Sequence, residues 1–378
     1  MIEGLYLHIP FCDHICTYCD FPKLFTKGQD HKRYIDALIN ELNHYYQMEQ
    51  FKGIKTIYIG GGTPTALRVE QIAPLFEWLQ QHIDFSKIEE FTIEANPENL
   101  TVEKIQYLIH NGITRISMGV QTFNEQLLAV IGRRHNPEQV KTAVKTLHDC
   151  GFYNINLDLI YAIPGQTLEN LKHDLDCIEA LGVEHISAYS LIVEEHTALY
   201  LDYMKDKLEL IDNAVEAAMY EYVIKRLKAL GYQHYEISNF AKNKPSLHNQ
   251  IYWKNEEYYG LGLGSHGYVL GVRYHNTRSI HKYMDALLAN TLPVVEQTEL
   301  TREEKIEESM FLGLRLIDGV DLKALSQRFE TDLMALYEKA YEPLLKQGQL
   351  QLLGSQLSLT PKGLLLANDV FEQFLLSI

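Results

Sequence analysis

The chain has 378 residues, of which 46% are hydrophobic and 22% are charged, and its formal net charge is −16. This composition is that of a soluble globular protein large enough for two domains. The acidic balance argues against a large nucleic-acid interface, which needs a basic surface. The sequence shows neither an apolar run as long as a membrane span nor the basic, apolar start of a signal peptide, so we expect a cytoplasmic protein.

The first 200 residues predict a regular alternation of strands and helices. Short β-rich runs indicate strands at 5–9, 55–60, 90–95, 113–119, 153–160 and 184–191. Amphipathic patterns between them indicate helices at 31–47, 69–82, 101–110, 137–149 and 168–181. Six β/α units in succession favour an α/β fold with a parallel sheet and right-handed crossovers.

Polar or glycine-rich segments follow three of these strands. The segment GGGTPT follows the second strand, NPENL follows the third and GVQTF follows the fourth. In parallel α/β barrels the carboxyl ends of the strands meet at one edge, and the functional site forms there. We therefore expect these segments to gather on one rim.

The remaining chain changes character twice. A long helix is expected at 212–230, and the stretch 232–275 is rich in Tyr, His, Asn and Gly. Further on the pattern predicts a short hairpin, formed by QLQLL and QLSLT, and a last helix. Three helices are expected before this hairpin, at 302–316, 321–329 and 332–347. This order resembles a winged helix.

We predict three structural parts, at 1–235, 236–295 and 296–378. The first is a barrel, the second is an extension packed on it, and the third is a smaller helical domain. Winged helices often bind DNA, but the last part holds 14 acidic and 8 basic residues. Because DNA binding needs excess positive charge, a lid or a partner surface is favoured for this domain.

Three of the five cysteines lie close together in HIPFCDHICTYCDFP, and they are Cys12, Cys16 and Cys19. In a reducing compartment such clustered thiols more often bind metal than form disulfides. A zinc ion would need a fourth ligand, for which His8 and His14 are candidates. An iron–sulfur cubane held by three thiolates would keep one iron free for another ligand. Cys150 and Cys177 lie on apolar faces of predicted helices and are expected in the core.

The cysteine spacing, with Tyr18 directly before the third cysteine, resembles the signature of the radical S-adenosylmethionine (SAM) superfamily. That resemblance implies a partial (β/α)6 barrel, a [4Fe-4S] cluster on the three cysteines, and SAM bound to the free iron. It also implies that the residues around SAM are Tyr6, Tyr18, Gly61, Gly62, Thr63, Glu94, Gln121, Arg133, Asp158 and Ile192.

Further motifs resemble one branch of this superfamily, which contains oxygen-independent coproporphyrinogen III oxidases and haem chaperones. They are YLHIPFC, GGGTP, EANP, SMGVQTF, NLDLIYAIPGQT, YEISNFAK and HNQIYW. Ala162 departs from the branch, which usually has glycine there; because alanine is small, we expect the loop to be unaffected.

Three features favour the haem chaperones over the oxidases. The oxidases have a fourth cysteine where this chain has Phe21, and they carry a longer extension before the first strand, whereas here five residues precede Tyr6. The third feature is the HNxxYW motif, which is typical of the chaperones.

By this resemblance the haem contacts are His248, Asn249, Tyr252 and Trp253. An imidazole can ligate haem iron, and aromatic rings can pack on the porphyrin. The axial ligand is left open, because His266, His275 or His281 could serve instead.

The expected function is therefore binding of haem and its transfer to acceptor haemoproteins, with no nucleic-acid partner. A homodimer and a transient contact with a membrane protein are left open. The alternative is an oxygen-independent coproporphyrinogen III oxidase. A third, less favoured interpretation is a zinc-stabilised regulator that acts through its C-terminal domain.

Overall fold

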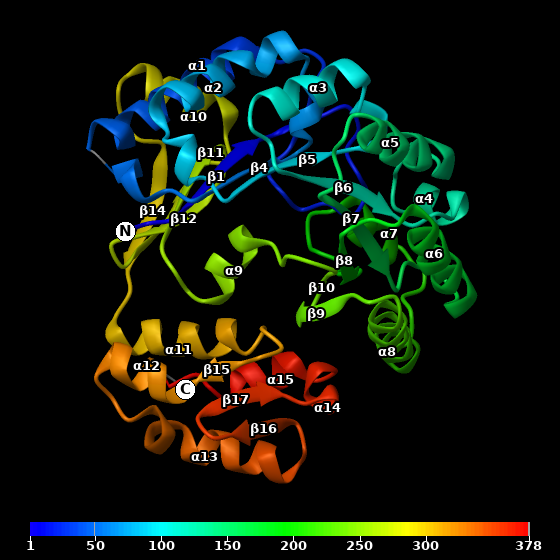
Figure 1. The fold of residues 1–378 in the computed structure, drawn as a ribbon, viewed down its shortest axis with the longest axis vertical. Helices are drawn as coiled ribbons and strands as arrows, with labels where there is room; N and C mark the ends of the chain where they lie inside the picture. Colours follow the sequence, from blue (N-terminus) through cyan, green and yellow to red (C-terminus); the bar gives the residue numbers. More distant parts are fainter. Residues whose placement is uncertain (49, 377–378) are drawn as a thin grey trace.

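The computed structural model describes residues 1–48 and 50–376, and its centre is a twelve-stranded sheet that curves as an open arc (Figure 1). Seven neighbouring strands in this sheet run parallel, in the order β11-β1-β4-β5-β6-β7-β8. Six of them match the predicted strands: β1 (Gly4–Ile9), β4 (Thr56–Gly61), β5 (Glu90–Ala95), β6 (Arg115–Gln121), β7 (Ile155–Tyr161) and β8 (His185–Ser190).

Helices cover the convex outer face of the arc, as the β/α alternation predicts (Figure 1). The predicted helices are present as α1 (His31–Gln47), α2 (Val69–His82), α3 (Val102–His110), α5 (Pro137–Asp149), α6 (Leu168–Leu181) and α8 (Asn213–Ala229). The α/β class is thus confirmed. Shorter elements without a periodic signal in the sequence are β2 (Phe11–Cys12), β3 (Leu24–Phe25), α4 (Glu125–Val130), α7 (Ala198–Tyr203), η1 (Gln50–Gly53), η2 (Pro64–Ala66), η3 (Phe85–Lys87) and η4 (Pro97–Asn99).

The Tyr- and Gly-rich stretch after α8 extends the sheet at both edges. One edge gains β10 (Asn239–Ala241), which pairs antiparallel with β8, and then β9 (Gln233–Glu236). The other edge gains β11 (Tyr258–Gly262), parallel to β1, followed by three antiparallel strands, which are β12 (His266–Val269), β13 (Val272–Asn276) and β14 (Val294–Glu299). Helix α9 (Leu247–Trp253) lies on the concave side of the arc, and α10 (Ile280–Leu288) lies on the convex side (Figure 1).

The C-terminal part has its own hydrophobic core, which includes Leu314, Tyr337, Leu357 and Phe374. Its predicted hairpin is present, and a third short strand joins it. The elements are α11 (Arg302–Gly313), β15 (Val320–Asp321), α12 (Leu322–Phe329), α13 (Leu333–Lys346), β16 (Leu350–Leu353), β17 (Gln356–Leu359), α14 (Pro361–Leu364) and α15 (Ala367–Glu372). This arrangement is winged-helix-like, although the exact domain boundaries at 235/236 and 295/296 stay predictions.

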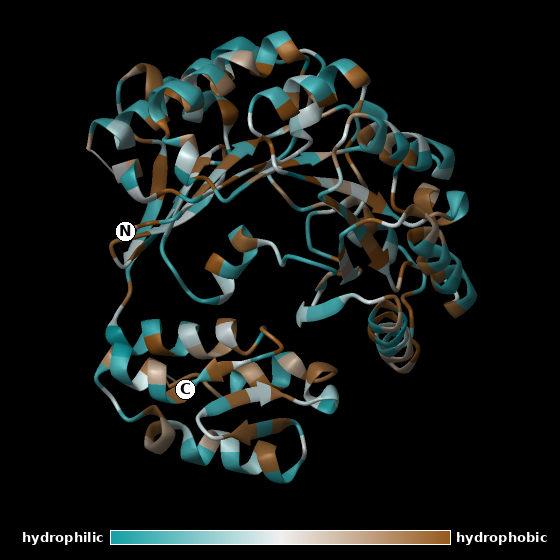
Figure 2. Cartoon of the chain, in the orientation of Figure 1, coloured by the Kyte–Doolittle hydropathy of each residue, from teal (hydrophilic) through white to brown (hydrophobic). Residues whose placement is uncertain are grey.

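The main core lies between the sheet and its helices. In β1, Leu5, Leu7 and Ile9 are fully buried in this core, whereas the alternate residues Tyr6 and His8 point to the concave side. Figure 2 shows hydrophobic residues along the strands and on one side of the helices, with hydrophilic residues on the outside. None of the helices in the described part of the chain is long and apolar enough to cross a bilayer.

Candidate functional site

A cavity of about 490 Å³ opens on the concave side, at the carboxyl ends of the parallel strands. All three clustered cysteines line it, together with nine of the ten residues predicted around SAM. The exception is Tyr6, which lies deeper, with its hydroxyl 3.0 Å from His8 Nδ1. The structure therefore brings the predicted rim together, while the binding roles of these residues stay predictions.

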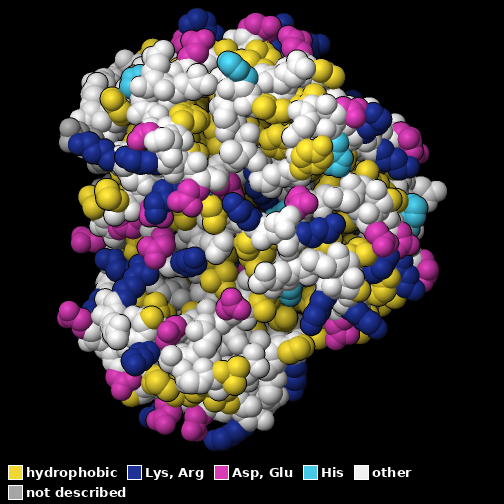
Figure 3. Space-filling view, viewed as in Figure 1, with side chains coloured by type: hydrophobic (Ala, Val, Ile, Leu, Met, Phe, Trp, Pro, Cys, Tyr) yellow, Lys and Arg dark blue, Asp and Glu magenta, His cyan; other side chains and the backbone are white. Residues whose placement is uncertain are grey.

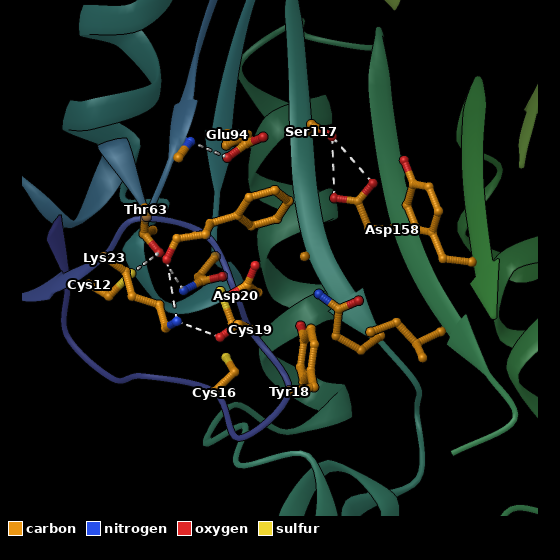
Figure 4. A pocket seen from close by; sticks show the side chains of 18 of the residues that line it. Cys12, Cys16, Tyr18, Cys19, Asp20, Lys23, Thr63, Glu94, Ser117 and Asp158 are labelled. Atoms are coloured by element: carbon orange, nitrogen blue, oxygen red, sulfur yellow. Dashed lines mark hydrogen bonds between the residues drawn. The ribbon is translucent and has the colours of Figure 1, made fainter. Parts of the chain in front are cut away.

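Cys12 is the last residue of β2, and Cys16 and Cys19 lie on the segment between β2 and β3. Figure 4 shows the three thiols beside the cavity. All three are free thiols, and the hydroxyl of Thr63 lies 3.7 Å from Cys12 Sγ. Burial raises the pKa of Cys12 to about 12, and it also raises the pKa of Cys19. Thiolates at these positions therefore need a positive partner, and coordination to iron would supply one.

The zinc interpretation loses one of its candidate ligands in this geometry. His8 is 2% exposed, with Nδ1 3.0 Å from the Tyr6 hydroxyl and Nε2 2.7 Å from the carbonyl oxygen of Pro22. Both of its ring nitrogens are thus engaged. His14 does line the cavity with the cysteines.

Arg133 lines the cavity and carries one buried donor without a partner. Its Nη1 donates to Asn96 Oδ1 over 2.6 Å and its Nη2 to the Tyr18 hydroxyl over 3.4 Å, whereas its buried Nε has no partner. A Cβ on Gly119 would lie 2.6 Å from Nη2, so the glycine of SMGVQ makes room for this guanidinium. An orphaned guanidinium donor fits the carboxylate of a ligand such as SAM.

Glu94 connects the end of β5 to the glycine-rich loop (Figure 4). Its Oε2 accepts from the backbone N–H of Gly61 and its Oε1 from the hydroxyl of Tyr58, both over 2.9 Å. Burial raises the pKa of Glu94 to about 7. A Cβ on Gly60 would lie 2.9 Å from Oε1, and one on Gly62 2.7 Å from the carbonyl carbon of Pro10, which explains the run of glycines.

Asp158 lies in the neighbouring wall of the cavity, on β7. It accepts a hydrogen bond from Asn156 Nδ2 over 2.7 Å. It also accepts one from Ser117 Oγ over 3.3 Å, which Figure 4 shows. Burial also raises the pKa of Asp158. With Glu94 it gives the cavity two acceptors for hydroxyl or amino groups.

Tyr58 and Arg115 also line the cavity, although the sequence had not led us to expect them there. Arg115 is 3% exposed, and its Nε has no partner. A signal was present, because Arg115, Ser117 and Gly119 alternate along β6 and must share one face. A charged residue on the face that carries Ser117 and Gly119 marks that face as a polar wall.

Two residues of the cavity region adopt left-handed backbone conformations. Gln121 has φ 68° and Ala162 has φ 58°. The related proteins usually have glycine at the position of Ala162, and the left-handed backbone there explains this preference better than the side-chain size on which our expectation rested. A non-glycine residue there costs about 1–2 kcal/mol.

The HNQIYW motif forms helix α9, and only Asn249 of its four predicted haem contacts lines the cavity. His248 is fully buried, with Nδ1 2.8 Å from Thr56 Oγ1 and Nε2 2.8 Å from the Tyr252 hydroxyl. Burial lowers the pKa of His248 to about 3, so the ring is neutral. Trp253 packs under the guanidinium of Arg315, which lies 4.4 Å from its ring centre.

In this conformation the motif joins the barrel to the C-terminal domain. The carboxylate of Glu90 accepts from Ser246 Oγ and from the backbone N–H of Leu247, which fixes the start of α9 on β5. At the other end Asn255 Nδ2 donates to Ser309 Oγ on α11 over 3.3 Å. Haem contact through this motif stays a prediction, and it requires His248 to exchange one of its two hydrogen bonds for iron.

Comparison with known proteins places these features in a family. Residues 6–178 match the Radical SAM superfamily, and residues 300–366 match the HemN C-terminal domain. The chain is 43% identical over 375 residues to the heme chaperone HemW of Lactococcus lactis, covering 99% of this chain and 97% of that protein. It is 42% identical to heme chaperone HemW of Bacillus subtilis, with 99% of both chains covered.

A solved structure supports the fold. Coproporphyrinogen III oxidase (HemN) from Escherichia coli superposes with a TM-score of 0.86 at 24% identity, covering 100% of this chain and 91% of that one. The near-full-length identity to the curated relatives then decides the assignment. The chain belongs to the radical SAM superfamily and, within it, to the family of proteins named heme chaperone HemW.

Proposed function

We propose that this protein binds haem and passes it to acceptor haemoproteins, while a [4Fe-4S] cluster and exchangeable SAM occupy the cavity. One observation carries the proposal: the cavity gathers Cys12, Cys16 and Cys19, and Phe21 lies at its mouth where an oxidase of this branch would have a fourth cysteine. The names of the relatives, which match over nearly the whole chain, support haem as the cargo.

The cluster and SAM fit the side chains around the cavity. Three thiols supply the donors that a site-differentiated cluster needs, and when bound the cluster would supply electrons and an open iron to SAM. The orphaned Nε of Arg133 suits the SAM carboxylate, and Glu94 and Asp158 suit its amino group or ribose hydroxyls. The glycines at 61 and 62 let the backbone approach the ligand closely.

A second candidate function is the oxidative decarboxylation of coproporphyrinogen III. The superposition on the coproporphyrinogen III oxidase over the whole chain favours it. This enzyme would have to release methionine from SAM only when substrate is present. Phe21 in place of a cysteine is a feature against it.

One sample can separate the two functions. Protein reconstituted anaerobically with iron and sulfide is titrated with haem and, in parallel, assayed for protoporphyrinogen IX formation. We expect a saturable Soret band and no product. Product formation without saturable haem binding would establish the oxidase instead.

The proposal includes a cytoplasmic location and acceptor haemoproteins as partners. Self-association and contact with a membrane protein stay predictions. On the face shown in Figure 3, Lys and Arg side chains are interspersed with Asp and Glu, in keeping with a protein that does not use nucleic acid.

A further inference from the structure

Two histidines lie opposite each other on the neighbouring strands β12 and β13, near one side of the sheet. His266 begins β12 and His275 is its direct partner on β13. Their rings stack with centroids 5.1 Å apart and an interplanar angle of 30°. His275 is tied by Nε2 to Glu296 over 3.0 Å, whereas the exposed ring of His266 makes no hydrogen bond to any described residue.

The strand directions place this pair at the edge of the sheet where the cavity opens, although neither histidine lines the cavity itself. Strand β11 runs parallel to β1 and β12 runs antiparallel to β11, so β12 begins at the edge where β1 ends. The cysteine segment follows from that same end of β1. His266 therefore lies along the same edge of the sheet as the three cysteines.

The register places His266 on the concave face of the sheet. Gly4 pairs with Tyr258 and Tyr258 pairs with Tyr268, and directly paired residues point to the same face. Because side chains alternate along a strand, His266 points to the same face as Tyr268, and Tyr6 points to the same face as Gly4. Since Gly4, Tyr258 and Tyr268 are paired, all of these residues face the concave side, on which Tyr6 lies. The ring of His266 thus points to the side on which the cavity opens.

The segment that carries Phe21 runs past Gly264, two residues before His266, where an added Cβ would lie 2.5 Å from Pro22 Cγ. It is held there from two sides. His8 Nε2 donates to the carbonyl oxygen of Pro22 over 2.7 Å. From the other side Arg278 Nη2 donates to the carbonyl oxygen of Asp20 over 2.6 Å. Phe21 lies between these two anchored residues, Asp20 and Pro22, and lines the mouth of the cavity. Its side chain is 68% exposed, so this fixed turn presents a large apolar surface to solvent.

We propose that haem docks on this rim, with His266 as the axial ligand of the iron, the ring of Phe21 against the porphyrin and Arg278 facing a propionate. This inference rests on the proposed function and names its cargo site. A free imidazole, an exposed aromatic ring and an exposed guanidinium match the iron, the apolar ring and the carboxylates of haem. His248, in contrast, is fully buried with both nitrogens engaged.

His266 is in the right state to ligate iron. Although its ring is accessible, partial desolvation by its neighbours lowers the pKa of His266, and the charges of His275, Arg278 and Arg273 act in the same direction. The ring is therefore neutral at physiological pH, with a nitrogen lone pair for the metal. The Glu296 carboxylate holds the ring of His275 in place behind it.

The test is haem titration of the anaerobically reconstituted full chain, followed by the Soret band. Loss of a residue that only supports a metal ligand typically weakens metal binding ~10- to 100-fold. Because His266 would be the ligand itself, we expect His266→Ala to raise the Kd for haem by more than this and to shift the Soret band. Added imidazole should restore the wild-type spectrum of this variant. Phe21→Ala should weaken binding while keeping the position of the band.

The matched control is His110→Ala, which replaces an exposed histidine at the end of α3. This residue comes shortly before the amino end of β6, whereas the cavity opens at the carboxyl ends of the strands. This variant should bind haem as the wild type does. If wild-type protein binds haem and His266→Ala keeps its affinity and spectrum, the proposed site is wrong while the proposed function stands. If the wild type does not bind haem saturably, the proposed function itself fails. If His248→Ala loses the wild-type haem spectrum with its cluster content unchanged, while His266→Ala keeps that spectrum, then His248 of HNQIYW is the axial ligand.

Discussion

Replacing Glu94 with glutamine should weaken SAM binding without unfolding the site. A glutamine carbonyl can accept from the Gly61 N–H as Glu94 Oε2 does, and its amide can donate to the hydroxyl of Tyr58. What Glu94→Gln removes is the negative charge. A hydrogen bond to a charged acceptor contributes about 1.5–3 kcal/mol, so we expect Kd for SAM to rise roughly 10- to 150-fold.

The raised pKa of Glu94, about 7, makes this effect dependent on pH. If SAM binds to the carboxylate form, the ionised fraction rises from about 9% at pH 6 to about 91% at pH 8, and the affinity rises about tenfold with it. The Glu94→Gln variant should show no such rise. Tyr58→Phe, which removes a donor to the carboxylate but keeps its charge, should move the midpoint of the profile to higher pH.

The assay is equilibrium dialysis of SAM against reconstituted protein at several pH values under anaerobic conditions. Cluster content, measured as iron and sulfide, must be equal in wild type and variants. A wild-type profile that is flat between pH 6 and 8, together with unchanged affinity in Glu94→Gln, would refute this role of Glu94.

Replacing any one of Cys12, Cys16 and Cys19 with alanine should abolish the visible absorption of the cluster, whereas Cys150→Ala and Cys177→Ala should retain it. His248→Ala should lower the free energy of unfolding by about 2–3 kcal/mol in urea titrations, because it leaves the buried hydroxyl of Thr56 and the half-buried hydroxyl of Tyr252 without their histidine partner. A variant as stable as wild type would contradict this structural role. Glu41 is fully buried, and burial raises its pKa to about 7, above the unfolded value, so its stabilisation is fully present below about pH 4.5 and is lost as pH rises through 7. Between about pH 4.5 and 7 the free energy of unfolding of the wild type should therefore fall as the pH rises. Its slope should be steeper than that of Glu41→Gln by up to about 1.4 kcal/mol per pH unit. Equal slopes in the two proteins would refute this role of Glu41.

The barrel could be predicted from sequence because each of its strands and helices carries a local signal. Alternating apolar residues and capped amphipathic helices such as α5, where Asn136 and Gln139 form a reciprocal capping box, are visible within a few residues. Strands β11–β14 were missed for the opposite reason. Strand β11 pairs with β1, more than 240 residues away, and its glycines have no strand preference of their own.

The candidate site divides in the same way. The cysteines and glycines are recognisable by spacing, since a metal group and a close backbone approach demand those residue types. The two hydrogen bonds of His248 depend on Thr56, far away in the chain, so no sequence pattern could show that this histidine is buried and engaged. The stacked pair of His266 and His275 likewise exists only through the strand register.

Whether this chain carries haem is measured most directly by the stoichiometry of haem bound to the reconstituted protein. We expect a Soret band that saturates at one haem per chain, stays with the protein through gel filtration and transfers to an apo-haemoprotein. A titration that rises without saturation, with no haem retained on the column, would contradict this expectation.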